Sequence, residues 1–131
     1  MMNRLANTKN PYQGKFKKVL CVCSAGLLRS PSLAWVLSNP PYNCNTRAAG
    51  MDNEYALVPV DEVLLEWCEE IVCAEKSHAD DLKELFRGNE NLKKPIVVLD
   101  IPDSYRMRDP KLIAIINDQL TRMNYSGDKK Q

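Results

Sequence analysis

The chain has 131 residues, of which 44% are hydrophobic and 27% charged, and its formal net charge is +1. This length fits one domain with its own core, and the balanced charge argues against nucleic acid or an anionic membrane as a partner. No apolar run approaches the ~18 residues of a membrane span, and the opening MMNRLANTKNPYQGKFKK lacks the apolar core of a secretory signal.

The first half of the chain predicts a strand, a helix and a second strand. Residues 19–23 (VLCVC) form a short apolar, β-rich run that is typical of a buried strand. Ser30 followed by proline predicts a helix N-cap with proline at the first helical position. This helix is expected to end near Ser38, before an Asn-Pro-Pro sequence. Residues 44–48 (CNTRA) predict the second strand.

The second half continues the alternation. Apolar residues with helical spacing predict one amphipathic helix, and β-rich runs alternate with two more helices. The expected elements are a helix over 60–67, a strand over 70–74, a helix from Ser77 to about Gly88, a strand over 95–100 and a helix from Pro110 onward.

This order predicts a three-layer αβα fold with a four-stranded parallel sheet and right-handed crossovers. The single domain is expected over 17–125, with a polar lead-in over 1–16 and a tail over 126–131. Ligands of such folds bind at the carboxyl ends of the strands. The loops 23–30 and 100–110 should therefore share one edge of the sheet.

The loop after the first strand has the composition of an anion site. Gly26 permits a positive φ, so that successive amides can turn inward toward the start of the next helix. Arg29 adds a fork of donors that matches two phosphate oxygens. Cys23 lies at the base, where these positive groups favour its thiolate, and the Ser30 hydroxyl can donate to the sulfur. The residues expected to bind phosphate are Ser24, Ala25, Gly26, Leu27, Leu28, Arg29 and Ser30.

A thiolate beneath a cradle for a tetrahedral dianion predicts attack on phosphorus through a phosphocysteine. The leaving oxygen needs a proton from a nearby acid. Asp100, Asp103 and Asp109 are the candidates on the loop 100–110. This chemistry calls for no metal and no cofactor.

The quoted residues resemble the low-molecular-weight protein tyrosine phosphatases. KVLCVCSAGLLRSP (18–31) is similar to the family's strand followed by C-x5-R-S-P, and IPDSYR (101–106) is similar to its acid loop. The resemblance covers about 17–125 in the family's order. It implies Cys23 as nucleophile, Arg29 as phosphate-binding arginine, Asp103 as general acid and Tyr105 as part of the substrate cleft. It also implies a phosphorylated protein or a small aryl phosphate as substrate.

The sequence departs from the family pattern at several positions. Gly26 stands where the family usually has asparagine, and Leu28 stands where many members have a second cysteine. Arg106 replaces a second tyrosine and could favour an acidic substrate. Tyr55 is the one aromatic residue in a short specificity loop, 51–59. These departures leave the preference for phosphotyrosine open.

Three other functions are weighed against a phosphatase. An arsenate reductase on this fold needs two further cysteines, but Ala74 stands where the first is expected, and Cys73 should face the other side of the strand. A phosphocysteine carrier of a sugar phosphotransferase system has a similar CSAGLL loop but needs neither Arg29 nor Asp103. A binding module with an inactive site would not need to retain the nucleophile, the arginine and the acid, Cys23, Arg29 and Asp103.

The remaining notable residues are expected to be structural. Five cysteines without a C-x-x-C pair, together with one histidine, indicate free thiols in a reducing cytoplasm rather than a zinc site. His78 is expected at the surface, and both tryptophans, Trp35 and Trp67, in the core. Asp109 is expected to cap the last helix, and the acidic residues around the third strand are expected to be solvated. The oligomeric state is left open.

Overall fold

The computed structural model describes residues 16–24, 29–51, 58–102 and 109–128. Its sheet has four parallel strands in the order β2-β1-β3-β4. The strands are β1 (Lys18–Cys23), β2 (Asn45–Gly50), β3 (Glu70–Cys73) and β4 (Ile96–Val98). The helices are α1 (Arg29–Ser38), α2 (Glu62–Trp67), α3 (Lys76–Leu85) and α4 (Pro110–Arg122), with a short 3-10 helix, η1 (Glu90–Leu92), before β4.

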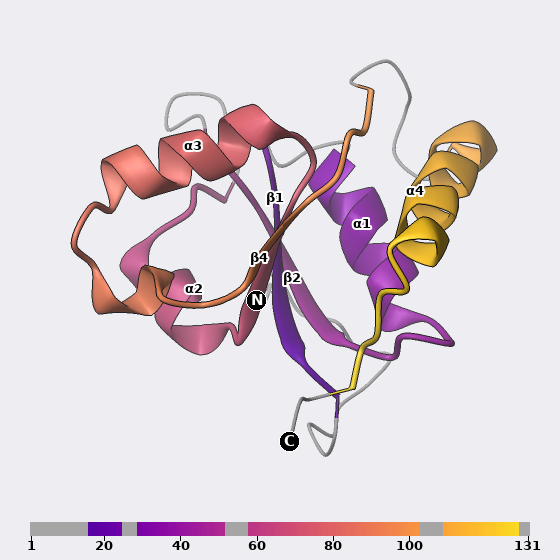
Figure 1. Cartoon of the computed structure of the whole chain (residues 1–131), viewed down its shortest axis with the longest axis horizontal. Coiled ribbons are helices and arrows are strands. Elements are labelled where there is room, and N and C mark those ends of the chain that lie inside the picture. The colour runs from indigo at the N-terminus through magenta and orange to yellow at the C-terminus, as the bar shows by residue number, and fades with distance from the viewer. Residues whose placement is uncertain (1–15, 25–28, 52–57, 103–108, 129–131) are drawn as a thin grey trace.

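The helices cover both faces of the sheet, which confirms the predicted three-layer αβα fold. Figure 1 shows α1 and α4 on one side of the strands and α2 and α3 on the other. Successive side chains of β1 pack against opposite faces of the sheet, because side chains alternate across a strand. Val19, Cys21 and Cys23 pack in the cluster beneath α1 and α4, whereas Leu20 and Val22 pack in the cluster beneath α2 and α3.

The parallel register brings the carboxyl ends of the strands to one edge. Cys23 at the end of β1 is level with Gly50 at the end of β2. Past the strand ends, the N–H of Met51 donates to the Cys23 carbonyl at 2.8 Å, and the N–H of Ile101 donates to the Ala74 carbonyl at 2.9 Å. The segments that follow β1, β2, β3 and β4 are therefore neighbours in space.

Two helix boundaries test the predicted signals. Asp109 accepts a hydrogen bond from the Lys111 N–H at 2.8 Å, with Pro110 at the start of α4, so the predicted cap is confirmed. Helix α1 ends at Ser38 as predicted, but it begins at Arg29. The prediction of Ser30 as N-cap is therefore wrong, because Ser30 already belongs to the first helical turn.

The opposite edge of the sheet holds a buried ion pair. Lys17 Nζ donates to both carboxylate oxygens of Glu70, at 3.1 and 3.2 Å, and lies 4.6 Å from the centre of the Tyr125 ring. The Tyr125 hydroxyl also donates to Glu70. Burial, with the nearby Glu70 charge, raises the pKa of Tyr125. Glu70 is 5% exposed, so the expectation that the acidic residues flanking β3 are solvated is wrong for Glu70.

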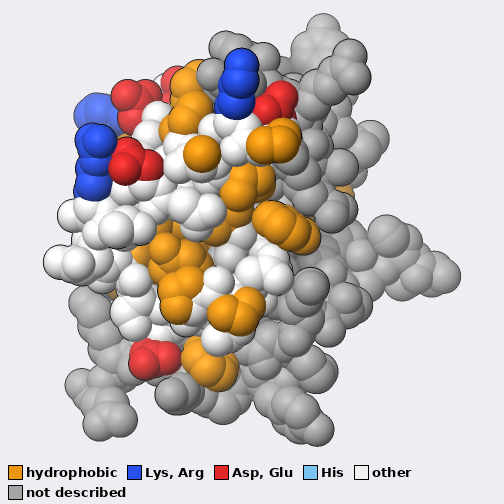
Figure 2. Space-filling model, turned by 90° about the vertical axis from the view of Figure 1, so that its right-hand side faces the viewer, with side chains coloured by type: hydrophobic (Ala, Val, Ile, Leu, Met, Phe, Trp, Pro, Cys, Tyr) orange, Lys and Arg blue, Asp and Glu red, His pale blue; other side chains and the backbone are white. Residues whose placement is uncertain are grey.

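The two tryptophans differ from the prediction of a buried core pair. Trp35 is 37% exposed, because α1 turns this residue away from the sheet. Trp67 is partly buried against the cluster under α2, and the Arg47 guanidinium stacks 4.1 Å from its ring centre. Figure 2 views the side of the molecule on which α4 lies, where apolar side chains alternate with polar and charged ones. Within the described residues, no helix is long and apolar enough to cross a membrane.

Candidate active site

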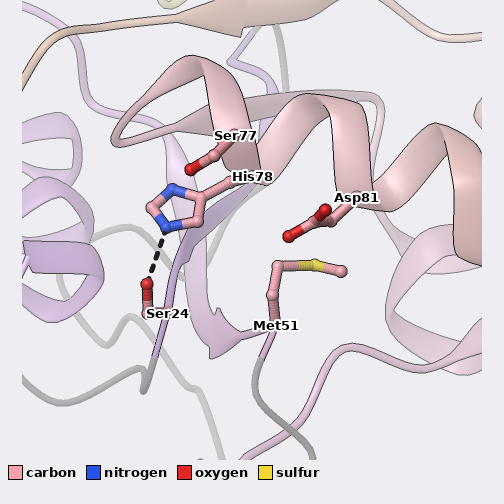
Figure 3. A pocket seen from close by; sticks show the side chains of 5 residues that line it. All are labelled: Ser24, Met51, Ser77, His78 and Asp81. Atoms are coloured by element: carbon pink, nitrogen blue, oxygen red, sulfur yellow. Dashed lines mark hydrogen bonds between the residues drawn. The ribbon is translucent and has the colours of Figure 1, made fainter.

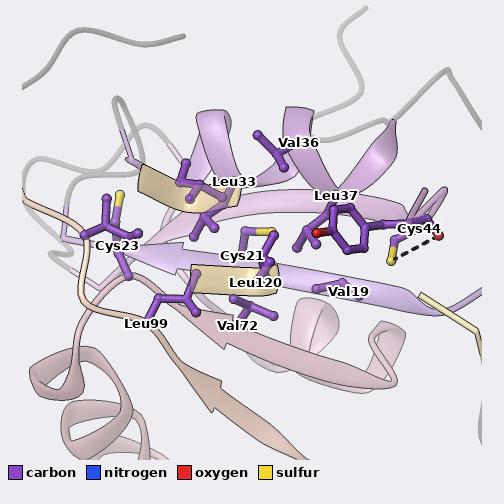
Figure 4. Packing of buried hydrophobic residues seen from close by; sticks show 14 of the residues in the cluster. Val19, Cys21, Cys23, Leu33, Val36, Leu37, Cys44, Val72, Leu99 and Leu120 are labelled. Carbon is purple, nitrogen blue, oxygen red and sulfur yellow. Dashed lines mark hydrogen bonds between the residues drawn. The ribbon is translucent and has the colours of Figure 1, made fainter. Parts of the chain in front are cut away.

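Cys23 ends the central strand and faces the first turn of α1. Its side chain is 3% exposed, at one end of the buried cluster that continues along β1 through Cys21 and Val19 (Figure 4). The thiol donates to Ser30 Oγ at 3.2 Å, and the Ser30 N–H donates to Cys23 Sγ at 3.4 Å. Because α1 begins one residue before Ser30, an amide of its positive N-terminal end points at the sulfur.

Arg29 is buried and held from three segments of the sheet edge. Its exposure is 3%, and its Nη1 donates to Glu75 Oε1 at 2.9 Å and to the Ile101 carbonyl at 3.1 Å. Its Nη2 donates to Ser24 Oγ over a longer 3.4 Å. These partners follow β1, β3 and β4, so the orientation of the guanidinium depends on the assembled edge of the sheet.

Sequence reasoning missed Glu75 and misplaced His78. His78 is 2% exposed, so the prediction of a surface position is wrong. Glu75 is the N-cap of α3, and its N–H donates to His78 Nδ1 at 3.3 Å. In a capping box, a side chain at the third helical position accepts from the N-cap N–H in this way. The available signal was a histidine three positions after a glutamate that closely follows the third strand.

A pocket opens between the end of β1 and α3. It has a volume of about 260 Å³ and is lined by Ser24, Met51, Ser77, His78 and Asp81 (Figure 3). A second hollow of about 290 Å³ shares Met51 and Asp81 with it and extends along α3 to Glu84 and Leu85. The space beside the residue that follows Cys23 is therefore open to a ligand.

The other four cysteines, Cys21, Cys44, Cys68 and Cys73, are buried. Burial raises the pKa of Cys44 and of Cys73 to about 12, and that of Cys68 to about 11. Burial also raises the pKa of Cys21, with nearby thiols adding to the effect. All five cysteines are free of disulfides. Raised pKa values suppress the nucleophilic thiolate at these four positions.

Two of the three candidate acids, Asp100 and Asp109, lie within the described residues. Asp100 is exposed, and its backbone exchanges two hydrogen bonds with the Gln119 side chain, at 2.7 and 2.6 Å, which ties the end of β4 to α4. Asp109 caps α4. The predicted site residues that lie outside the described residues are Ala25, Gly26, Leu27, Leu28, Tyr55, Asp103, Tyr105 and Arg106. Among the described residues, no three His, Cys, Asp or Glu side chains are placed to share a metal ion.

Comparison with known proteins identifies the fold. No protein-family model and no curated protein matches the sequence. Among solved structures, Wzb of Vibrio vulnificus in complex with benzylphosphonate matches with a TM-score of 0.64 and 20% identity, over 82% of this chain and 97% of that one.

Two further solved structures match the same fold over most of this chain. The YwlE arginine phosphatase of Geobacillus stearothermophilus matches with a TM-score of 0.59 and 17% identity, over 82% of this chain and 88% of that one. A low molecular weight protein tyrosine phosphatase of Streptococcus pyogenes matches with a TM-score of 0.55 and 14% identity, over 82% and 93%. The chain thus has a parallel αβα architecture with a cysteine and an arginine at its carboxyl edge. Its fold is that of the low-molecular-weight protein tyrosine phosphatases, as the sequence resemblance implied.

Proposed function

We propose that the protein is a phosphomonoesterase that works through a phosphocysteine intermediate. One observation carries the proposal. The Cys23 sulfur contacts both the hydroxyl and the N–H of Ser30 at the start of α1, and the next residue back, Arg29, is a buried cation fixed by three segments. A nucleophile beside an anchored anion-binding cation suits attack on a phosphoryl group.

The two chemical steps follow from these groups. The Cys23 thiolate attacks phosphorus; the S–P bond forms as the P–O bond to the leaving group breaks, and Asp103 donates the proton that this oxygen takes up. The amides of 24–30 and the Arg29 guanidinium hold the equatorial oxygens. Asp103, now a carboxylate, removes a proton from the water that attacks phosphorus, which releases phosphate and the thiolate. The Ser30 hydroxyl can rotate to donate to that thiolate.

We propose a phosphorylated protein as the substrate, with phosphotyrosine as the phosphorylated residue. Proteins of the same fold are described as tyrosine phosphatase and as arginine phosphatase, so both phosphorylated side chains are tested below. Tyr55, Tyr105 and Arg106 are proposed to line the cleft. Five free thiols fit a reducing cytoplasmic setting.

The buried position of Cys73 argues against an arsenate reductase. Cys73 is 0% exposed and packs in the cluster under α2 and α3, whereas Cys23 belongs to the cluster on the other face of the sheet. Its raised pKa also suppresses the thiolate that a disulfide relay requires. Cys73 is therefore a poor resolving thiol for Cys23.

The proposal is tested by turnover of p-nitrophenyl phosphate with and without a chelator. We expect activity that survives chelation, is absent in Cys23→Ser, and falls about 10²–10⁴-fold in Asp103→Asn because a general acid is lost. Asp100→Asn and Asp109→Asn are the matched controls, and a larger loss in either would contradict the assignment of Asp103. Rates on phosphotyrosyl and phosphoarginyl peptides of equal sequence then separate the two substrate classes.

The lifetime of the phosphocysteine separates a phosphatase from a carrier. Both functions form the intermediate, but water releases the phosphoryl group in a phosphatase. Rapid-quench mass spectrometry should show phosphorylated Cys23 decaying within one turnover in the wild type and accumulating in Asp103→Ala. A wild-type phosphocysteine that persists until an acceptor protein is added would support the carrier instead.

A further inference from the structure

The Ser24 hydroxyl receives two hydrogen bonds from fixed donors. His78 Nδ1 accepts from the Glu75 N–H at 3.3 Å, so Nδ1 carries no proton and the neutral ring must carry its proton on Nε2. That Nε2 lies 3.0 Å from Ser24 Oγ and therefore donates to it (Figure 3). Arg29 Nη2 donates to the same oxygen at 3.4 Å.

With these two hydrogen bonds accepted, the Ser24 hydroxyl can still act only as a donor. A serine hydroxyl has two acceptor positions and one donor position. With both acceptor positions occupied by His78 and Arg29, the Ser24 O–H proton must point in the third direction. Ser24 is exposed and lines the pocket of about 260 Å³. Among the described residues, none accepts a hydrogen bond from this hydroxyl.

This donor lies beside two groups of the proposed phosphoryl-binding site. Ser24 directly follows Cys23, and its oxygen contacts the guanidinium nitrogen Nη2 of Arg29, the cation that would hold the transferred group. An anion bound by Arg29 thus lies beside a hydroxyl that is already committed to donating. Such a pre-oriented donor costs no reorganisation when charge moves onto the phosphoryl oxygens.

We propose that the Ser24 side chain is an additional binding group for a phosphoryl oxygen, and that His78 is a positioning residue that acts through it. This inference rests on the proposed phosphatase function, and adds a side-chain donor to the loop amides. His78 does not touch the substrate. Its Nε2–H occupies one acceptor position of Ser24 and so directs the serine proton away from α3 and toward the bound anion.

The test measures the affinity of the protein for oxyanions, using orthovanadate and inorganic phosphate as competitive inhibitors of p-nitrophenyl phosphate hydrolysis. Ser24→Ala should raise both inhibition constants about 10-fold, because one hydrogen bond to a charged oxygen is lost. Ser77→Ala is the matched control, since Ser77 is an exposed serine on the same pocket without a contact to Arg29. Inhibition constants that are equal in Ser24→Ala and the wild type would overturn the inference.

Failure of this inference is distinguishable from failure of the proposed function. If the wild type neither hydrolyses the substrate nor binds vanadate, the phosphatase proposal itself is wrong. If the wild type hydrolyses the substrate and binds vanadate, and Ser24→Ala has the same inhibition constants as the wild type, only the role of Ser24 is refuted. Thermal unfolding of each variant checks that the fold is retained.

The role of His78 is tested by two substitutions, His78→Gln and His78→Asn, and by a double-mutant cycle with Ser24→Ala. A glutamine amide can reach the position of Nε2, whereas an asparagine amide reaches that of Nδ1. His78→Gln should therefore retain vanadate affinity better than His78→Asn. In the Ser24→Ala background, His78→Asn should cause no further loss of affinity, because its effect passes through the Ser24 hydroxyl. Additive losses in that background would refute the positioning role.

Discussion

The pattern of thiol environments predicts that alkylation of the native protein at pH 7 is confined to Cys23. All five cysteines are buried, and burial raises the pKa values of the four other than Cys23. Iodoacetamide reacts with the thiolate, so the rate at each position follows the ionised fraction as well as access. At Cys23, by contrast, the backbone N–H of Ser30 at the start of α1 donates to the sulfur.

The expected differences in alkylation rate between the cysteines follow from their pKa values. A thiol at the ordinary value of 9.0 is ionised in about one molecule in 100 at pH 7, and one with a pKa of about 12 in about one in 10⁵. Cys44 and Cys73 should thus react about 10³-fold more slowly than an ordinary thiol, and Cys68, with a pKa of about 11, about 10²-fold more slowly. Because these pKa values are raised, each rate should rise about tenfold per pH unit up to the pKa.

The assay is timed alkylation followed by proteolysis and mass spectrometry of the five cysteine peptides. The same reaction in guanidinium chloride is the control, in which all five cysteines should react at similar rates because the folded environment is gone. Orthovanadate should protect Cys23 in the native protein. Native alkylation of Cys44 or Cys73 at the rate of Cys23 would refute the argument, since neither burial nor the raised pKa would then govern reactivity.

Two ion pairs give further predictions. Glu75→Gln should lower the free energy of unfolding by about 1–2 kcal/mol in urea titrations, because Arg29 keeps its Ile101 bond and Glu75 is 43% exposed; an unchanged midpoint would show that the Glu75 charge does not stabilise Arg29. Lys17→Met should cost about 3–5 kcal/mol because the buried Glu70 carboxylate loses its cation. Restoring stability by adding Glu70→Gln would support this reason, and a Lys17→Met protein as stable as the wild type would exclude it.

The sequence by itself determined the elements and their order, because these depend on neighbouring residues. Alternation of short β-rich runs and helical spacings predicted the strand and helix succession that the sheet shows. The Asp109–Pro110 pair marked the start of α4 correctly, since a cap and the proline at the next position act within one turn. Ser30 shows the limit of such signals, because α1 begins at Arg29, one residue before the predicted cap.

The tertiary structure alone decided how the candidate site is held together. Arg29 is fixed by Glu75 and Ile101, which are 46 and 72 residues away in the chain, and Ser24 meets His78 across 54 residues. These partners are neighbours only because β3 lies next to β1, with β4 beside it, and all the strands end at one edge. Burial of Glu70 and His78 has the same origin. No local pattern specifies which distant charge or donor comes to lie opposite a polar side chain, because the order of the strands in the sheet sets that pairing.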